Sequence, residues 1–429
     1  MVRLKQLWPS LMVLAVLVIG ARAVPITKLE SAVAKGAVCL DGSAPAYHLD
    51  KGSGSGVNNW IVHMEGGGWC ADTASCEERK SLMKGSSELM NEDFGFFGIL
   101  SGNQTSNPDF YNWNRVKVRY CDGSSFTGDI EAVDPAHKLY FRGFRIWQAA
   151  MDDLMAKGMS NAQNAILSGC SAGALAAILH CDRFKSILPE TAKVKCVSDA
   201  GFFINGKDIN GGSSMESYYS KVAATHGSAK NLPVSCTSSM KPELCFFPEN
   251  VVKTMQTPLF VINAAFDSWQ IKNILAPTVV DKHKEWNKCK QDFKKCTPTQ
   301  LQTVQGYREQ MLAALEPFRA TNTSGLFLDS CHTHCQGGSA ALWSGPQGPQ
   351  VGKTGGHNYL GGDVPSATCS SCNCSDGDKT ATDQITGGDG NSQTIPVHRM
   401  QQPLLSSSLL AEEIQRNNWF QQPETHSLK

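Results

Sequence analysis

The stretch from Ala165 to Leu179 constrains the fold and the chemistry of this chain more than any other. It consists of an apolar run, a Gly-Cys-Ser-Ala-Gly turn and a second run rich in alanine and leucine. The first run predicts a buried strand and the second predicts a helix. A serine on so tight a turn needs small neighbours, and Gly169 and Gly173 supply them on either side of Ser171. The pattern is typical of a nucleophile elbow, in which the serine projects at the start of a helix.

The Gly-x-Ser-x-Gly pattern is weak evidence when taken alone. A chain of 429 residues with 39 glycines shows it by chance about one time in three. A nucleophilic serine also needs a base, a carboxylate that orients the base, and donors for the oxyanion. The rest of the sequence therefore decides whether Ser171 is a candidate for catalysis.

The first 23 residues are typical of a secretory signal peptide. Arg3 and Lys5 precede an apolar segment at 11–19 and a small-x-small cleavage site at 21–23. A membrane anchor is the alternative, but the apolar segment is shorter than the roughly 20 residues that span a bilayer. We expect an extracellular protein with a signal peptide at 1–23 and a single catalytic domain at 24–360. A Cys-containing, low-complexity tail is expected at 361–429.

Composition agrees with secretion and excludes some partners. All 16 cysteines lie after the predicted signal, and in an oxidising compartment we expect most of them to form disulfides. Three sequons make Asn103, Asn322 and Asn373 candidate glycosylation sites. The formal net charge is zero, which argues against nucleic acid or an anionic membrane surface as a partner. We expect a monomer.

Strand and helix signals alternate along the chain, which predicts an α/β fold with a mostly parallel central sheet flanked by helices. Strands are predicted at 60–64, 115–120, 165–169, 258–263 and 325–329, and helices at 141–157, 172–180 and 303–317. Residues 205–250 contain Cys236 and Cys245 and are interpreted as a disulfide-tied excursion from the sheet. Residues 282–295 are interpreted as a solvated helix face.

A glycine-rich loop follows the first of these strands. The segment Trp60–Met64 leads directly into Glu-Gly-Gly-Gly-Trp-Cys at 65–70. Successive glycines let backbone N–H groups turn toward a ligand, as in the oxyanion holes of esterases. A plain turn is the alternative, but the position of the loop upstream of a nucleophile elbow favours the oxyanion role.

Asp267 and His334 are the candidate acid and base. Each follows a predicted strand, as Ser171 does, and the order Ser, Asp, His is the one that α/β-hydrolases use. Asp199 follows the strand next after the elbow, which is too early for the usual acid. Asp329 is too close in sequence to the histidine to orient it from a separate strand.

The histidine itself is ambiguous, because His332 and His334 belong to one turn and spacing does not separate them. A metal site is another interpretation of the Cys331 to Cys335 cluster, since cysteine and histidine are the usual zinc ligands. The tight spacing and the secreted context favour disulfides instead. We expect neither a metal nor a cofactor.

Four motifs in this order resemble the plant pectin acetylesterases, relatives of the Notum carboxylesterases. They lie at 65–70, 169–173, 265–270 and 330–336, and the resemblance covers roughly residues 39–343. It implies an α/β-hydrolase-like fold, His334 as the base, and hydrolysis of acetyl esters on cell-wall pectin. It also implies an oxyanion hole lined by Gly67, Gly68 and the amide of Ala172.

Two features depart from the family pattern. Ala174 stands where the family usually has a second glycine after the elbow, and the chain beyond Trp343 lacks the usual C-terminal helix and cysteine-proline ending. Two alternatives therefore accompany the prediction of a pectin acetylesterase. One is a carboxylesterase for longer acyl chains, as in the Notum branch, and the other is a catalytically impaired relative that binds polysaccharide.

Overall fold

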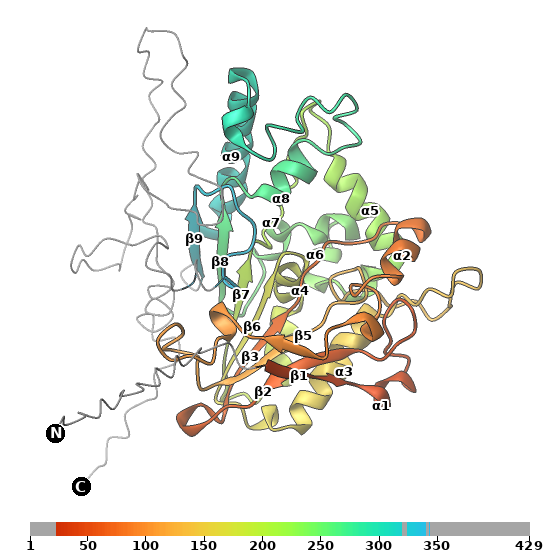
Figure 1. The fold of residues 1–429 in the computed structure, drawn as a ribbon, viewed down its shortest axis with the longest axis vertical. Coiled ribbons are helices and arrows are strands. Elements are labelled where there is room, and N and C mark those ends of the chain that lie inside the picture. The colour runs from red at the N-terminus through yellow and green to blue at the C-terminus, as the bar shows by residue number, and fades with distance from the viewer. Residues whose placement is uncertain (1–22, 320–323, 340–342, 344–429) are drawn as a thin grey trace, which may run out of the picture.

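The computed structural model describes residues 23–319, 324–339 and 343. Within these residues one nine-stranded sheet has the order β4-β1-β2-β5-β3-β6-β7-β8-β9. The strands are β1 (Ala23–Lys28), β2 (Ala46–Asp50), β3 (Asn59–Met64), β4 (Asp93–Gly95), β5 (Asn114–Val118), β6 (Asn164–Cys170), β7 (Lys193–Asp199), β8 (Leu259–Ala264) and β9 (Gly325–Asp329). Figure 1 shows this sheet running through the molecule from β1 to β9.

Six neighbouring strands of the sheet run parallel, from β5 through β3, β6, β7 and β8 to β9. The edge formed by β2, β1 and β4 is antiparallel. The prediction of a mostly parallel α/β sheet is therefore confirmed. The antiparallel edge was not predicted, because these strands are short and lie among turn residues.

The strand order reverses at β3, which makes the carboxyl end of this strand a topological switch point. The chain passes from β3 to β5 on one side and then crosses to β6 on the other side. In open parallel sheets, ligands bind outside the carboxyl ends of the strands at such a switch point. Both the glycine-rich loop, which follows β3, and Ser171, which follows β6, lie there.

The helices are α1 (Glu30–Val33), α2 (Thr73–Lys80), α3 (Gly143–Ala156), α4 (Ala172–Ile187), α5 (Ser214–His226), α6 (Val234–Thr237), α7 (Pro248–Val251), α8 (Ser268–Gln270) and α9 (Pro298–Arg319). Helix α4 is buried along most of its length and packs on β6 and β7, as Figure 1 shows. Its all-apolar first turns explain this burial, since a helix that is apolar all round belongs in a core.

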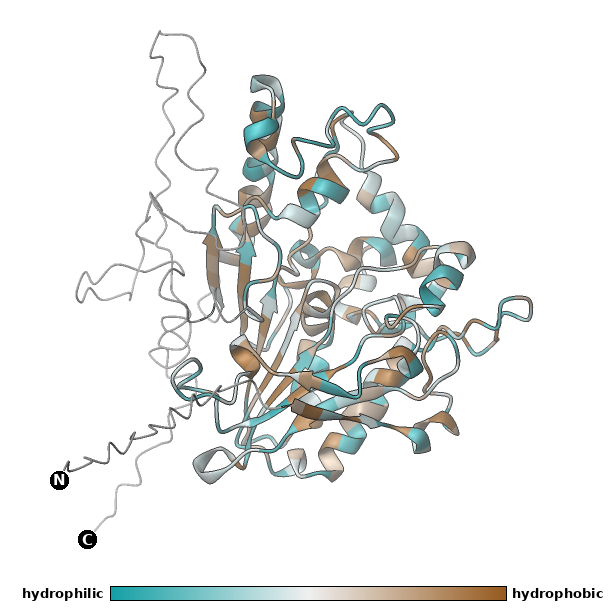
Figure 2. Ribbon diagram, viewed as in Figure 1, coloured by the Kyte–Doolittle hydropathy of each residue, from teal (hydrophilic) through white to brown (hydrophobic). Residues whose placement is uncertain are grey.

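The two faces of the sheet are covered differently. Alternate residues of each strand point to opposite faces, so Trp60 and Val62 join the large core beneath α3 and α4, while Ile61 joins a smaller core on the other face. The smaller core is closed by aromatic residues of the segment at 94–113, including Phe110 and Trp113. Figure 2 shows hydrophobic colour concentrated on the central strands.

The interpretation of residues 205–250 as a disulfide-tied excursion is confirmed, because Cys236 is bonded to Cys245. The segment also contains the 13-residue helix α5, which was not predicted. The helix buries Met215, Tyr219 and Val222, a helical spacing that the surrounding Gly, Ser and Asn residues obscure.

Residues 282–295 form turns and a short 3₁₀ segment at 293–295 instead of a solvated helix face. The reason is local cross-linking. Cys289 is bonded to Cys296, and buried Lys290 donates to the carbonyl of Ala276 and pairs with Asp281. These contacts curl the segment back on itself.

Disulfides connect elements across the described part of the chain. Six bridges are present, and two of them, Cys39–Cys121 and Cys170–Cys335, close long loops of 82 and 165 residues. The prediction that most cysteines are bridged is confirmed for these residues. Among the helices that the structure describes, none is both long and apolar enough to cross a membrane.

Candidate active site

Ser171 occupies the predicted strand-to-helix turn between β6 and α4. Its backbone has φ 59° and ψ −127°, a conformation that L residues rarely adopt. The strain is held by a hydrogen bond from the Ser171 N–H to the Asp199 carbonyl at 2.9 Å. Strained non-glycine residues of this kind concentrate at functional sites, and a strained strand-to-helix turn is typical of a nucleophile elbow.

The elbow requires small residues, because the backbones of the strand, the helix and the glycine-rich loop approach one another closely. A Cβ on Gly173 would lie 2.1 Å from the Met64 carbonyl oxygen, and one on Gly66 would lie 2.1 Å from the Cys170 carbonyl oxygen. Helix α4 and the glycine-rich loop can therefore meet only because both positions lack side chains. The unusual Ala174 is accommodated, because its buried methyl group faces Gly201.

His334, the predicted base, lies against Asp267, the predicted acid. The His334 Nδ1 and Asp267 Oδ2 atoms are 2.8 Å apart, and the carboxylate is fully buried. The other Asp267 oxygen accepts the N–H of Gln270, the last residue of α8. The Ser268 N–H also donates to the Thr333 carbonyl at 3.0 Å, so the loops that carry acid and base are joined by backbone as well as side chain.

The electrostatics around His334 favour its charged form. Burial alone would lower the pKa of the ring, but the charge and the hydrogen bond of Asp267 outweigh it and raise the pKa above 6.5. The second ring nitrogen, Nε2, is buried and has no hydrogen-bond partner among the described residues. An imidazole with one nitrogen fixed by a carboxylate and the other unpaired is arranged to accept a proton.

A disulfide brings the elbow and the base together. Cys170, which precedes Ser171, is bonded to Cys335, which follows His334, and their Cα atoms are 5.7 Å apart. Ser171, His334 and Asp267 follow the ends of three parallel strands, β6, β9 and β8, so all three lie at the carboxyl end of the sheet. No sequence spacing predicted this pairing.

Asp199 and Asp329, the alternative acids, have other partners. The Asp199 carboxylate accepts the N–H groups of Gln336 at 2.8 Å and Gly337 at 2.6 Å, which fixes the loop after His334. The Asp329 carboxylate accepts the Cys331 N–H at 2.9 Å. Burial raises the pKa of Asp199 to about 6 and that of Asp329 to about 7. Asp267 is thus the carboxylate that contacts His334.

His332 points elsewhere. Its ring stacks on Phe293 with centroids 4.2 Å apart. Cys331 and Cys335 are both disulfide-bonded, so neither offers a thiolate to a metal. The same holds for Cys70 and Cys76, which are bonded to each other beside buried His226.

The glycine-rich loop is anchored by a buried charge cluster at Glu65. This carboxylate pairs with Arg119 at 3.0 Å and Lys84 at 2.9 Å, lies 3.7 Å from Lys117, and accepts the Tyr120 N–H. Burial opposes its ionisation, but the three cations outweigh burial and lower the pKa of Glu65 to about 2. Removing Glu65 would leave buried cations unpaired, at a cost of about 3–5 kcal/mol.

Aromatic side chains from three distant segments pack beside His334. The Trp69 ring makes edge contacts with Phe203, Tyr219 and Trp269 at centroid distances of 5.0, 5.2 and 5.6 Å. Phe203 and Trp269 in turn lie 6.4 and 6.3 Å from the His334 ring. The sequence did not predict this cluster, because only Trp69 and Trp269 lie in recognised motifs.

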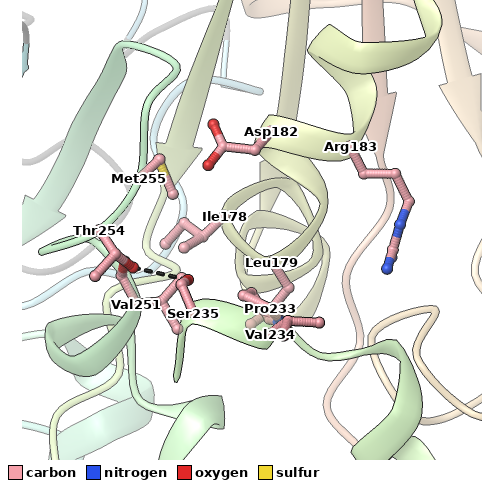
Figure 3. Close-up of a pocket in the computed structure, with 10 residues that line it drawn as sticks. All are labelled: Ile178, Leu179, Asp182, Arg183, Pro233, Val234, Ser235, Val251, Thr254 and Met255. Atoms are coloured by element: carbon pink, nitrogen blue, oxygen red, sulfur yellow. Dashed lines mark hydrogen bonds between the residues drawn. The ribbon is translucent and has the colours of Figure 1, made fainter. Parts of the chain in front are cut away.

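A separate hollow lies at the other end of α4, and Figure 3 shows its lining. The Asp182 carboxylate beside it accepts the backbone N–H groups of Gln256 and Thr257, and Thr254 donates to Ser235 at 2.8 Å. Its polar groups are thus bonded within the protein. Asp182 is 11 positions from Ser171, or roughly 16 Å along the helix, so this hollow is not part of the candidate site.

Of the candidate glycosylation sites, only Asn103 is described. It is half-buried, and its side-chain oxygen accepts the Thr105 N–H at 2.8 Å. Asn322 and Asn373 lie outside the described residues, as do the predicted signal peptide up to residue 22 and the tail at 361–429.

Comparison with known proteins identifies the family of the chain. A family model described as Pectinacetylesterase matches residues 19–362. Pectin acetylesterase 11 of Arabidopsis thaliana is 76% identical over 377 residues, which cover 86% of this chain and 96% of that protein. Pectin acetylesterase 7 of the same plant is 73% identical, with 86% and 97% covered.

A solved structure shares the fold. The Wnt deacylase Notum from Drosophila superposes with a TM-score of 0.63 at 25% sequence identity, covering 75% of this chain and 88% of that one. The extent of the family match and the identity to the Arabidopsis proteins together establish the relationship. The chain belongs to the pectinacetylesterase family of carboxylic ester hydrolases.

Proposed function

We propose that this protein hydrolyses acetyl esters of pectin, with Ser171 as nucleophile, His334 as general base and Asp267 as the orienting acid. The observation that carries the proposal is the 2.8 Å contact between His334 Nδ1 and Asp267, with Nε2 of the same ring unpaired and the Cys170–Cys335 disulfide joining the neighbours of Ser171 and His334. The names of the two Arabidopsis relatives support the substrate.

In the first half of the reaction, His334 Nε2 accepts the proton of Ser171 Oγ as this oxygen bonds to the acetyl carbonyl carbon. The carbonyl oxygen becomes an oxyanion within the hole lined by Gly67, Gly68 and the amide of Ala172. The C–O bond to the sugar then breaks, and His334 returns the proton to the departing sugar oxygen. The product is an acetyl-enzyme and a free sugar hydroxyl.

In the second half, water replaces the sugar. His334 accepts a proton from water as the water oxygen bonds to the acetyl carbon, and the proton passes to Ser171 Oγ as acetate leaves. Asp267 stabilises the imidazolium in both halves through its hydrogen bond and charge. No cofactor is needed to balance these steps.

The aromatic cluster favours a small acyl group. Phe203 and Tyr219 are fully buried, and they pack edge-on against Trp69 beside His334. Rings packed this tightly leave little room for a long acyl chain. We expect p-nitrophenyl acetate to be hydrolysed far faster than the octanoate or palmitate esters, and the reverse order would favour the long-chain alternative.

Secretion is part of the same proposal. The six disulfides of the described chain suit an oxidising compartment, and residues 1–23 have the pattern of a signal peptide. N-terminal sequencing of protein purified from the culture medium of expressing plant cells tests this. We expect a start at Val24 in the secreted form, and retention of Met1 inside the cell would contradict it.

The direct test of the enzyme is Ser171→Ala. We expect acetate release from acetylated pectin to fall by at least about 10⁴-fold while the fold persists. Circular dichroism and the melting temperature serve as the control for folding. A folded Ser171→Ala protein that still releases acetate would overturn the proposed function.

A further inference from the structure

Side chains hold three consecutive carbonyls of the glycine-rich loop. Arg79 Nη1 donates to the Gly67 carbonyl at 2.9 Å, and the Tyr120 hydroxyl donates to the Gly68 carbonyl at 2.8 Å. The Tyr218 hydroxyl donates to the Trp69 carbonyl, also at 2.8 Å. A loop with so many glycines would otherwise be free to rotate its peptide planes.

Holding a carbonyl also fixes the N–H group of the next residue. In a trans peptide the C=O and N–H bonds lie in one plane and point in opposite directions. Because Arg79 holds the Gly67 carbonyl, the Gly68 N–H points away from Arg79. Because Tyr120 holds the Gly68 carbonyl, the Trp69 N–H points away from Tyr120. Across the described residues, no hydrogen bond uses either of these two N–H groups.

The third peptide differs in a useful way. The N–H paired with the Trp69 carbonyl belongs to Cys70, and it already donates to the Gly123 carbonyl at 3.1 Å. The Tyr218 contact therefore fixes a peptide that has no free donor. Tyr120 and Tyr218 make the same chemical contact, but only Tyr120 orients an unpaired N–H.

The anchors are themselves rigid. Arg79 Nε donates to the Lys84 carbonyl at 2.9 Å, and its guanidinium lies over the Tyr120 ring at 5.0 Å. The Tyr120 hydroxyl accepts the Ser125 N–H at 2.9 Å, and Tyr120 is fully buried. Each of the two residues is therefore held by contacts outside the glycine-rich loop.

The same network reaches the elbow. Ser125 Oγ donates to the Ala172 carbonyl at 2.7 Å and accepts the indole N–H of Trp69 at the same distance. One serine thus joins Trp69 to the first residue of α4. The N–H donors of the loop and the amide of Ala172 are therefore connected through one hydrogen-bond network.

We propose that Arg79 and Tyr120 are positioning residues that aim the N–H groups of Gly68 and Trp69 at the oxyanion. This inference rests on the proposed function. It refines the predicted oxyanion hole, because the donors of the loop are the N–H groups of Gly68 and Trp69. These groups belong to the peptide bonds that follow Gly67 and Gly68. The two N–H groups stabilise the transition state and not the bound substrate, since the negative charge of the oxyanion develops only in the transition state.

Tyr120→Phe tests the inference, with Tyr218→Phe as the matched control. Loss of a whole oxyanion donor costs about 10²–10³-fold in kcat, and a misaimed donor costs part of this. We expect Tyr120→Phe to lower kcat by about 10- to 100-fold with little change in KM, for p-nitrophenyl acetate and for acetylated pectin alike. Tyr218→Phe is expected to leave kcat within about twofold of the parent.

A boronic acid inhibitor supplies a readout that altered folding would not mimic. The Ser171 oxygen adds to boron to give an anionic tetrahedral adduct that occupies the oxyanion hole. We expect its inhibition constant to rise in Tyr120→Phe by the same factor by which kcat/KM falls. An unchanged inhibition constant, or equal kcat values in the two phenylalanine variants, would overturn the inference.

Arg79→Met is the alternative test of the positioning role if Tyr120→Phe does not fold. Arg79 is partly exposed, and its loss frees the Gly67 carbonyl, so kcat and boronic acid affinity are expected to fall together. Failure of the proposed function has a different signature, because Ser171→Ala would then remain active. A dead Ser171→Ala beside a fully active Arg79→Met would reject the positioning role alone.

Discussion

The disulfide between Cys170 and Cys335 joins the residue before Ser171 to the residue after His334. The two cysteines are separated by 165 positions in sequence, and both are half-exposed. The bond therefore fixes the distance between the proposed nucleophile and its base by covalent means. Hydrogen bonds from Gln336 and Gly337 to Asp199 hold the same loop on its other side.

Replacing both cysteines by serine should reduce activity more than it reduces folding. We expect kcat to fall by about 10- to 100-fold, because a misplacement of about 1 Å in a catalytic group can cost 10²-fold. We also expect the free energy of unfolding to fall by about 2–5 kcal/mol, since the bridge closes a long loop. Steady-state kinetics and urea denaturation measure the two effects.

The buried bridge Cys181–Cys196 provides the control for that experiment. It joins the far part of α4 to β7 and closes a loop of 15 residues, so its loss also costs stability. It contacts neither Ser171 nor His334. A serine pair there should leave kcat unchanged at a temperature where the protein is folded, and an equal loss of kcat in both pairs would contradict the positioning role of Cys170–Cys335.

The two histidines of the 330–336 turn should differ sharply. His334 contacts Asp267, whereas His332 stacks on Phe293. We expect His334→Ala to lower kcat by at least about 10³-fold and His332→Ala to lower it by less than about fivefold. The assay is acetate release at a saturating concentration of acetylated pectin. Comparable losses in both variants would mean that the contact with Asp267 does not identify the base.

Asp267→Asn should change both the rate and its pH dependence. Only a neutral His334 can accept the serine proton, so activity rises with pH through the pKa of this ring. Asp267 raises that pKa against the effect of burial, so the uncharged amide should let it fall and move the acid limb of kcat/KM to lower pH. We expect kcat to drop by about 10³–10⁴-fold. If the acid limb does not move in Asp267→Asn, the group that titrates there is not His334.

Much of the central sheet and the site could be predicted from local sequence. The elbow, the glycine-rich loop and the strand ends before Asp267 and His334 are short patterns whose physical requirements are met within a few residues. Gly173 is an example, because its lack of a side chain is required by the Met64 carbonyl and is visible as a motif.

The rest depends on contacts between distant residues. Residue spacing alone did not separate His334 from His332. The fold separates them, because it directs the His334 ring to Asp267 and the His332 ring to Phe293. The pairing of Cys170 with Cys335 likewise follows from strand order and not from spacing. Helix α5 was missed because polar residues on both sides mask its apolar stripe.

Ala174 is expected to be a neutral feature of this chain for catalysis. Its methyl group is fully buried and faces Gly201, so the extra carbon is packed without displacing the elbow. Ala174→Gly should therefore lower the free energy of unfolding by about 1 kcal/mol and leave kcat unchanged. Thermal denaturation and p-nitrophenyl acetate hydrolysis check this. A rise in kcat of tenfold or more would show that the methyl group impairs the enzyme.

Asp329 should make the protein less stable as pH rises toward neutrality. Burial raises the pKa of Asp329 from 3.8 to about 7, so between these values the folded state holds a proton that the unfolded state has released. Stability falls with pH wherever the folded state binds more protons. One pKa unit corresponds to about 1.4 kcal/mol, so the fall is at most about 4 kcal/mol.

Asp329→Asn removes this dependence while keeping the shape of the side chain. We expect the variant to gain stability over the parent between pH 4.5 and pH 8, as measured by urea denaturation at each pH. Part of the slope should persist, because burial also raises the pKa of Asp199 to about 6. Exposed Glu92→Gln is the control and should follow the parent at every pH. If Asp329→Asn and the parent lost stability equally over this range, Asp329 would not be the group that retains a proton in the folded state.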